Sequence, residues 1–259
     1  MSLGRVFVIA TNVFREVIRD RILYLVGLFA IGLVAIGSFL PQVSAGTEDK
    51  ILLDLGLAAI NLVGLVIAIF LGTGLINKEI ERRTVYVLIA KPVSRIEFIV
   101  GKHLGLSAVL ALLVAAMTLI LFLILQFYQV PYPMGSLLIT EVFQFLELSL
   151  ITAVAILFGV FSSSLLATLL TVGVYLMGQL SRDLLKFGEI SQSAGLQRVT
   201  EFLYLVLPDL ARLNLKNQAI YGVSLLPEPI QLLTNGIYAV VYIALLLAIA
   251  TVIFSKRQF

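Results

Sequence analysis

The sequence contains no cysteine and no tryptophan, and it has a single histidine, His103. Without cysteine there can be no disulfide framework, no thiolate metal site and no cysteine nucleophile. A single histidine also excludes a metal site that is built from several histidines. These absences remove several classes of catalytic and metal-binding protein from consideration.

Charge is also scarce. Charged residues make up 13% of the 259 residues, against about 25% in an average soluble domain. Apolar residues make up 60%, and the mean hydropathy is +1.08. So few charges cannot cover the surface of a water-soluble protein of this size. The composition therefore excludes a soluble enzyme, a nucleic-acid-binding protein and a secreted disulfide-rich domain, and it indicates a polytopic membrane protein.

Long apolar runs separate the charged segments, and runs of about 20 residues can cross a hydrocarbon core of about 30 Å. We predict an all-α protein with one domain over residues 1–259. The first run is too long for a signal peptide, although the small-residue site Val43-Ser44-Ala45 leaves cleavage open as an alternative. The six expected transmembrane helices cover roughly residues 22–40, 52–76, 99–125, 137–160, 165–181 and 230–254.

Basic residues are distributed unevenly between the connections. Twelve of the eighteen lie in the N-terminal segment, around the connection 77–97 and at the C-terminus. The other side holds six, of which five lie in the long connection 182–229. Because cytoplasmic loops carry the excess of lysine and arginine, we expect both termini and residues 77–97 in the cytoplasm. Residues 182–229 are then outside, as a large connection that re-enters the membrane before the last span.

Residues 4–20 have the pattern of an amphipathic helix. Apolar and charged side chains recur on opposite faces at helical spacing. We therefore predict an interfacial helix that lies flat on membrane lipid and could also dock a partner protein. Its apolar face contains Val6, Ile9, Ala10, Val13 and Val17, and its charged face includes Arg15, Glu16 and Arg19.

The connection 77–97 predicts a short cytoplasmic helix, a proline turn and a restarted helix. Glu79, Arg82 and Arg83 share one helical face, in an order that favours side-chain pairing. Pro92 ends this helix because it lacks an amide donor. Ser94 and Glu97 then have the spacing of a capping box. The alternative is a positively charged loop that only sets the topology.

This connection resembles the signature of the permease subunits of type-2 ABC exporters. It is especially similar to the six-span bacterial permeases of the copper-processing, nitrous-oxide-reductase maturation type. The order of spans and connections also matches across nearly the whole chain. The matching residues are Leu75–Thr84, Leu88–Arg95 and Gly101-Lys102, and more weakly Leu207–Leu210, Asn214-Leu215 and Tyr221-Gly222.

The resemblance implies a half-transporter in the bacterial cytoplasmic (inner) membrane. Two chains would pair as a homodimer, and each would rest on a separately encoded ABC ATPase, so that two ATPase subunits bind ATP and Mg²⁺. The large external connection leaves room for an extracytoplasmic accessory protein. The implied ATPase-coupling residues are Glu79, Glu81, Arg82, Arg83, Thr84, Lys91, Pro92, Val93, Ser94 and Arg95, with Arg15, Glu16 and Arg19 as their partners.

The chain itself lacks a phosphate-binding loop. Before Gly101-Lys102, Ile96 occupies the position where that motif requires glycine, and His103 follows where it requires serine or threonine. We therefore expect a transport subunit that is not an enzyme and binds no cofactor of its own. We expect His103 to be a snorkelling or capping side chain near the inner interface.

Three polar residues recur at every third position of the fourth expected span: Glu141, Gln144 and Glu147. Intramembrane ionisable residues usually face the bundle or water. Three interpretations stay open: a contact with substrate or protons, a structural hydrogen bond to a neighbouring helix, and, for Glu141, a position near the membrane interface. The isolated residues Asn61, Thr73, Thr171 and Gln179 are expected to be helix-packing contacts.

Two other functions compete with the permease. A stand-alone secondary transporter or channel would use Glu147 and Glu141, and it predicts broken helices at matching positions in two halves. An intramembrane enzyme or an assembly scaffold is the third candidate. No nucleophile or metal-ligand set accompanies the two carboxylates in the sequence, so catalysis has little support.

Overall fold

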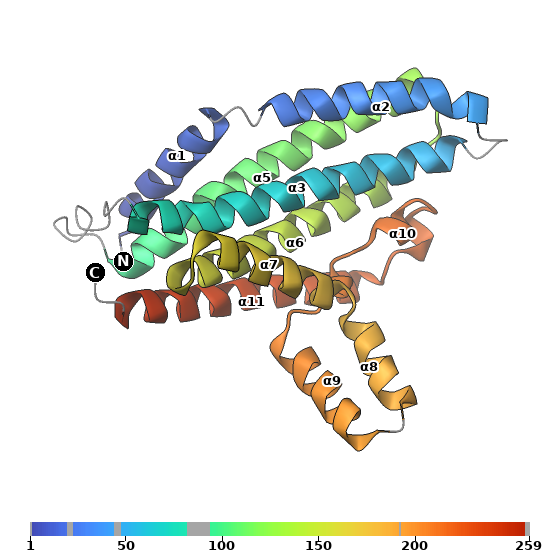
Figure 1. The fold of residues 1–259 in the computed structure, drawn as a ribbon. Coiled ribbons are helices and arrows are strands. Elements are labelled where there is room, and N and C mark those ends of the chain that lie inside the picture. The colour runs from blue at the N-terminus through green and yellow to red at the C-terminus, as the bar shows by residue number, and fades with distance from the viewer. Residues whose placement is uncertain (1, 20–22, 44–47, 82–93, 192, 257–259) are drawn as a thin grey trace.

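The computed structural model describes residues 2–19, 23–43, 48–81, 94–191 and 193–256, and every regular element in these ranges is helical. Figure 1 shows long helices side by side in one bundle, with a helical hairpin that extends to one side. The first turn of α1 and the last turn of α11 lie at the same end of the bundle (Figure 1).

The bundle helices are α1 (Leu3–Arg19), α2 (Leu23–Val43), α3 (Glu48–Glu81), α5 (Arg95–Phe127), α6 (Met134–Phe161), α7 (Ser164–Gln179) and α11 (Pro229–Lys256). The connection between α7 and α11 contains α8 (Ser181–Ile190), α9 (Ala194–Val206) and α10 (Lys216–Ala219). It also contains two 3₁₀ turns, η1 (Leu210–Arg212) and η2 (Val223–Leu225).

Four of the described helices, α3, α5, α6 and α11, are each long and apolar enough to cross a membrane. Two bent pairs raise the number of candidate spans to six, namely α1 with α2 and α7 with α8, the latter bent by 63°. With 34 and 33 residues, α3 and α5 are about 50 Å long and so exceed the hydrocarbon thickness. The described residues thus contain four to six candidate spans, and the predicted six is the upper figure.

Helix α6 lies at the centre of the bundle, where it contacts α3, α5, α7 and α11. Its middle section is fully buried and includes the small residues Ala153 and Ala155. Small side chains let neighbouring backbones approach closely, and close packing is what holds helices together in lipid. The polar residues of α6 are therefore held in a crowded interior.

Helix α1 confirms the predicted N-terminal helix, but its apolar face packs on α5. The buried residues of this face are Val6, Val13 and Val17. A Cβ atom added at Gly105 of α5 would lie 2.6 Å from the carbonyl oxygen of Ala10, so this position has no room for a side chain. The prediction that α1 lies flat on lipid did not anticipate this helix–helix contact.

The connection after α7 has two parts with different placements. Helices α8 and α9 pack against each other as a hairpin that extends away from the bundle (Figure 1). Helix α9 ends at Val206, just before Pro208, which has no amide donor to continue a helix. Residues 208–219 then return to the bundle, where the hydroxyl of Ser136 on α6 donates to the carbonyl oxygen of Ala219 at 2.7 Å.

Candidate functional site

The start of α5 is fixed by the capping box that the sequence predicts. The amide of Glu97 donates to Ser94 Oγ at 3.3 Å, and the amide of Ser94 donates to Glu97 Oε2 at 2.9 Å. Together the two bonds satisfy backbone donors that a helix start leaves free. Glu79 and Glu81 lie in the last turn of α3. The predicted coupling residues Arg82, Arg83, Thr84, Lys91, Pro92 and Val93 lie outside the described residues.

Glu97 also binds the beginning of α1, which the sequence reasoning missed. Its Oε1 accepts a hydrogen bond from the amide of Ser2 at 2.6 Å, and Arg5 Nη1 lies 3.8 Å from Oε2. The partners are more than ninety positions apart in the chain, so no local pattern could reveal this contact. On the other side, Arg95 Nη1 donates to the carbonyl oxygen of Phe254 in α11 at 2.6 Å. The start of α5 therefore joins both ends of the chain.

The charged face of α1 is exposed to solvent at Arg15, Glu16 and Arg19. Within the described ranges, no ion pair joins these three residues to another side chain. Their predicted pairing with Glu79, Arg82 and Arg83 stays a prediction, because those partner side chains are outside the described part of the protein.

The polar residues of α6 do not share a single face. At 3.6 residues per turn, each residue rotates the helix by about 100°. Glu147 follows Glu141 by six residues, so the two side chains point about 120° apart around the helix axis. Glu147 faces α7, where its Oε1 accepts a hydrogen bond from Gln179 Nε2 at 2.6 Å. Gln179 Oε1 in turn accepts from Asn214 Nδ2 at 3.3 Å. Glu141 instead lies beside α5, next to Thr118.

Residues 208–219, which we call the returning segment, contribute a cation to the bundle interior around Glu147. Lys216 of α10 is mostly buried and interacts electrostatically with both Glu147 and Glu141. Burial lowers the pKa of Lys216, and the two carboxylates oppose that shift. One turn before Gln179 on α7, the hydroxyl of Tyr175 donates to Asn61 Oδ1 of α3 at 3.2 Å. Gln179, predicted as an isolated packing residue, thus links Glu147 of α6 to Asn214, which precedes α10.

Many polar atoms in the cluster around Glu141, Gln144 and Glu147 form no hydrogen bond to another described residue. Buried polar atoms are normally paired, so each exception needs an explanation. Among the described residues, the buried side-chain atoms without a partner belong to Asn61, Thr140, Glu141, Gln144 and Glu147. In the same ranges, no group of three or more histidine, aspartate or glutamate residues could hold a metal ion. The cluster is suited to polar or cationic contacts.

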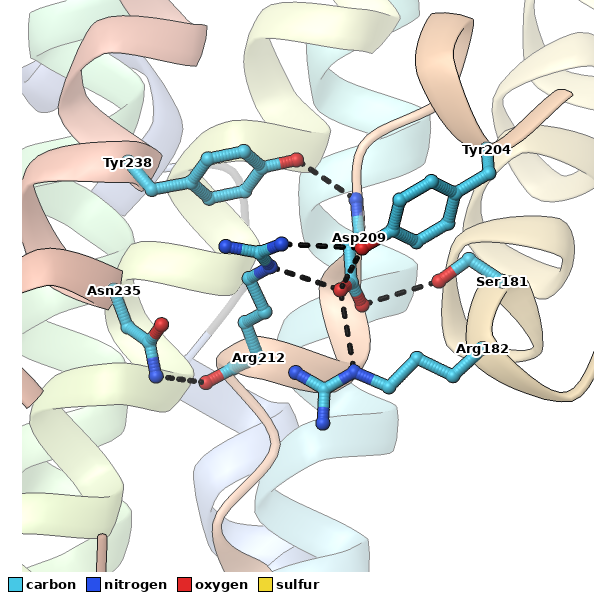
Figure 2. A network of polar contacts seen from close by, with 7 residues as sticks. All are labelled: Ser181, Arg182, Tyr204, Asp209, Arg212, Asn235 and Tyr238. Atoms are coloured by element: carbon cyan, nitrogen blue, oxygen red, sulfur yellow. Dashed lines mark hydrogen bonds and ion pairs between the residues drawn. The ribbon is translucent and has the colours of Figure 1, made fainter. Parts of the chain in front are cut away.

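A second polar network fixes the returning segment at its entry to the bundle. Figure 2 shows the buried carboxylate of Asp209 between two arginines and a serine. Its Oδ2 lies 2.9 Å from Arg212 Nε and 3.2 Å from Arg182 Nε. Its Oδ1 accepts a hydrogen bond from Ser181 at 3.1 Å. Asp209 thus connects the start of α8 to the turn η1.

Helix α11 and α9 complete this network (Figure 2). The hydroxyl of Tyr238 accepts from the amide of Asp209 at 2.8 Å, and Asn235 Nδ2 donates to the carbonyl oxygen of Arg212 at 3.3 Å. Hydrogen bonds to Tyr204 and Asp209 raise the pKa of Arg212 above its ordinary value. The network therefore ties the hairpin, the returning segment and α11 to one another.

A comparison with known protein families identifies the family of this chain. Residues 7–259 match the family described as ABC-2 family transporter protein. The chain belongs to this family. This ABC-2 protein is therefore a membrane permease component of an ABC transporter, and as a transport subunit it lacks the ATPase motif. The family in general implies an ABC ATPase partner. A search of curated proteins found no match.

Proposed function

We propose that this ABC-2 permease is one membrane-spanning half of an ATP-driven exporter in the bacterial cytoplasmic membrane. It pairs with a second copy of itself, and each copy rests residues 77–97 on one of two separately encoded ATPase subunits, which bind ATP and Mg²⁺. The observation that supports this proposal is the cluster at the start of α5, where Ser94 caps α5, Glu97 contacts the beginning of α1 and Arg95 contacts α11.

This cluster supports a mechanical role for residues 79–95. Helix α3 ends at Glu81, and Ser94 is the N-cap of α5, so the segment is continuous with both helices. A displacement of the segment therefore acts on α3 and α5, and through Glu97 and Arg95 it also reaches the ends of α1 and α11. An element that moves as a unit can bias the membrane helices between two arrangements.

The proposal assigns roles to the coupling residues. Glu79, Glu81, Arg82, Arg83 and Thr84 form the helix that faces α1, where Arg15, Glu16 and Arg19 are its partners. Each exposed ion pair contributes under about 1 kcal/mol, so the geometry of the group matters more than any single pair. The proline turn, with Lys91, Pro92, Val93, Ser94 and Arg95, then presents its apolar and basic tip to the ATPase.

Within the membrane, the proposal places the translocation pathway along α3 and α7, next to Gln144 and Glu147. Support comes from the buried, partly unpaired polar atoms of these residues and from Asn61 of α3. Outside, the α8–α9 hairpin offers an exposed surface for an extracytoplasmic accessory protein. The resemblance to copper-processing permeases makes metal-maturation systems the first place to look for a substrate.

The function is tested by copurifying the permease with its ATPase and measuring ATP hydrolysis in nanodiscs. We expect a complex with two copies of each subunit, in which the permease stimulates hydrolysis. Joint replacement of Glu79 and Arg83 by alanine should keep the complex intact and lower that stimulation severalfold, because the segment no longer moves as a unit. The measurement is the hydrolysis rate at equal complex concentration.

A matched control replaces Arg198 and Glu201, an exposed pair of opposite charge on α9, by alanine. This variant should keep wild-type stimulation. Wild-type stimulation in a well-folded Glu79/Arg83 variant would remove the segment from the mechanism and leave it as a topology signal. Transport by the permease without any ATPase would instead favour a stand-alone transporter that uses Glu147 and Glu141.

A further inference from the structure

An apolar groove of about 480 Å³ lies on the surface between α5 and α6. On α5 it extends from Ala111 to Phe122, a distance of about 16 Å at 1.5 Å per residue. The α6 side includes Met134, Leu138 and Val142. These side chains can receive an alkyl chain of moderate length.

A carboxylate lies within this apolar lining. Glu141 is only 5% exposed, and neither of its carboxylate oxygens has a hydrogen-bond partner among the described residues. The hydroxyl of Thr118, which also lines the groove, donates to the carbonyl oxygen of Val114 at 2.8 Å. An unpaired carboxylate in an apolar environment is costly unless a cation or a proton compensates its charge.

The charges that the neighbouring elements supply do not balance Glu141. Lys216 of α10 interacts with both Glu147 and Glu141, so one ammonium group faces two carboxylates. No ion pair within 4.0 Å joins Glu141 to a basic residue in the described part of the chain. Tyr175 of α7, the other titratable group in this interior, hydrogen-bonds to Asn61 beside Glu147. The groove therefore has at its base a carboxyl group that forms no ion pair with a basic residue in the described part of the chain.

The depth of Glu141 indicates where a ligand would lie. Helix α6 is 28 residues long, about 42 Å, and Glu141 is about 10 Å from its external end at Met134. In a hydrocarbon core of about 30 Å, this places the carboxylate about 5 Å below the outer boundary. An amphipathic molecule whose polar head is near the interface would bring that head level with Glu141.

We propose that this groove binds an amphipathic amine, with its alkyl chain along α5 and α6 and its ammonium group at the carboxylate of Glu141. The apolar lining selects the chain, and the unpaired carboxylate selects a cationic head over a neutral or anionic one. Such a site is independent of the ATPase contact, so binding at the groove and ATP coupling can be tested separately. An amine-bearing membrane lipid and a free amphipathic amine share this chemistry.

The test uses the full-length protein in detergent with dodecylamine that carries a diazirine for photolabelling. Dodecanol with the same diazirine is the neutral probe of equal chain length. We expect the amine to label α5 and α6 residues of the groove, as mapped by mass spectrometry. Glu141→Gln should reduce amine labelling at least fivefold and leave labelling by the alcohol unchanged.

Two alanines provide a matched pair of variants. Ala115→Phe fills the groove from an exposed position and should abolish labelling by both probes. Ala244→Phe places the same side chain on an exposed site of α11 outside the groove and should change nothing. Thermal unfolding of each variant checks that it is folded. Equal labelling of wild-type protein and Glu141→Gln by the amine would overturn the proposal.

Nanodiscs distinguish the two sources of the amine. Suppression of labelling by phosphatidylethanolamine, relative to phosphatidylglycerol, would identify a lipid head group as the occupant. Labelling that is equal in the two lipids supports a free amphipathic amine. If wild-type protein is unlabelled and Ala115→Phe converts a dimer to a monomer in light scattering, the groove is an interface between copies and the proposal is wrong.

Discussion

At the scale of single residues, Asp209 shows how burial changes what a side chain contributes. It is 3% exposed and contacts two arginines, whose side chains are 53% and 37% exposed. If an ion pair is broken, the arginine side chains can be solvated by water, whereas the side chain of Asp209 stays buried. The carboxylate of Asp209 therefore fixes residues 208–219 in place, and the two arginines compensate its negative charge.

Asp209→Asn should destabilise the protein by about 2 kcal/mol, a typical value for hydrogen bonds that involve a charged group. The neutral amide keeps the contact with Ser181 but loses the charge that binds Arg182 and Arg212. The thermal midpoint in detergent should fall by several degrees.

The control for this change is Asp183→Asn on the exposed surface of α8, two positions from Ser181. It removes the same charge from the same part of the protein and should leave the midpoint within experimental error. Equal midpoints for the two variants would mean that the Asp209 network does not stabilise the fold.

At the scale of elements, the contact between α1 and α5 depends on the absence of side chains at Gly101 and Gly105. Added Cβ atoms would lie 2.8 Å from Ile9 and 2.6 Å from the carbonyl oxygen of Ala10. Because one of these neighbours is backbone, it can move away only if α1 moves. Small residues at a spacing of four thus determine how closely the two helices pack.

Gly105→Ala should displace α1 and destabilise its contact with α5 by about 1 to 3 kcal/mol, as other overpacking changes do. The chain has no native cysteine, so a single reporter can be introduced at Val13, which is 1% exposed. In the Val13→Cys background, Gly105→Ala should raise the rate of maleimide labelling severalfold.

Gly32→Ala in α2 is the matched control, because a Cβ atom there would have no neighbour within 4 Å. It should leave the labelling rate of Val13→Cys unchanged. If Gly105→Ala also leaves that rate unchanged, α1 does not pack on α5 through this position.

At the scale of the whole molecule, the beginning of α1 and the end of α11 lie together at the start of α5. The asymmetry of lysine and arginine predicts that this end of the bundle is cytoplasmic. The same reasoning places the α8–α9 hairpin outside.

Single cysteines test this topology in intact cells with an impermeant maleimide. A cysteine at Arg198, exposed on α9, should be labelled readily, and a cysteine at Arg83 should be labelled only after the membrane is opened. The chain has no cysteine of its own to give background. Labelling of the cysteine at position 83 in intact cells would mean that the proposed orientation is wrong.

Features that depend on neighbouring residues were predictable from the sequence. The helix class, the capping box of Ser94 and Glu97 and the N-terminal helix all follow from local patterns, and the structure confirms them. The sequence predicts a snorkelling or capping role for His103, but its side chain is buried, with Nε2 3.0 Å from the carbonyl oxygen of Ser149. Its packing partner on α6 is not visible in any local pattern.

The sequence by itself determined that this is a helical membrane protein, because composition and apolar run length are properties of the chain alone. It also identified Glu141, Gln144 and Glu147 as intramembrane polar residues. Only the tertiary structure decided which neighbours they meet: Glu147 meets Gln179 across the bundle, whereas Glu141 faces an apolar groove. The physical reason is that helix–helix packing sets which faces come together, and packing depends on contacts between residues far apart in the sequence.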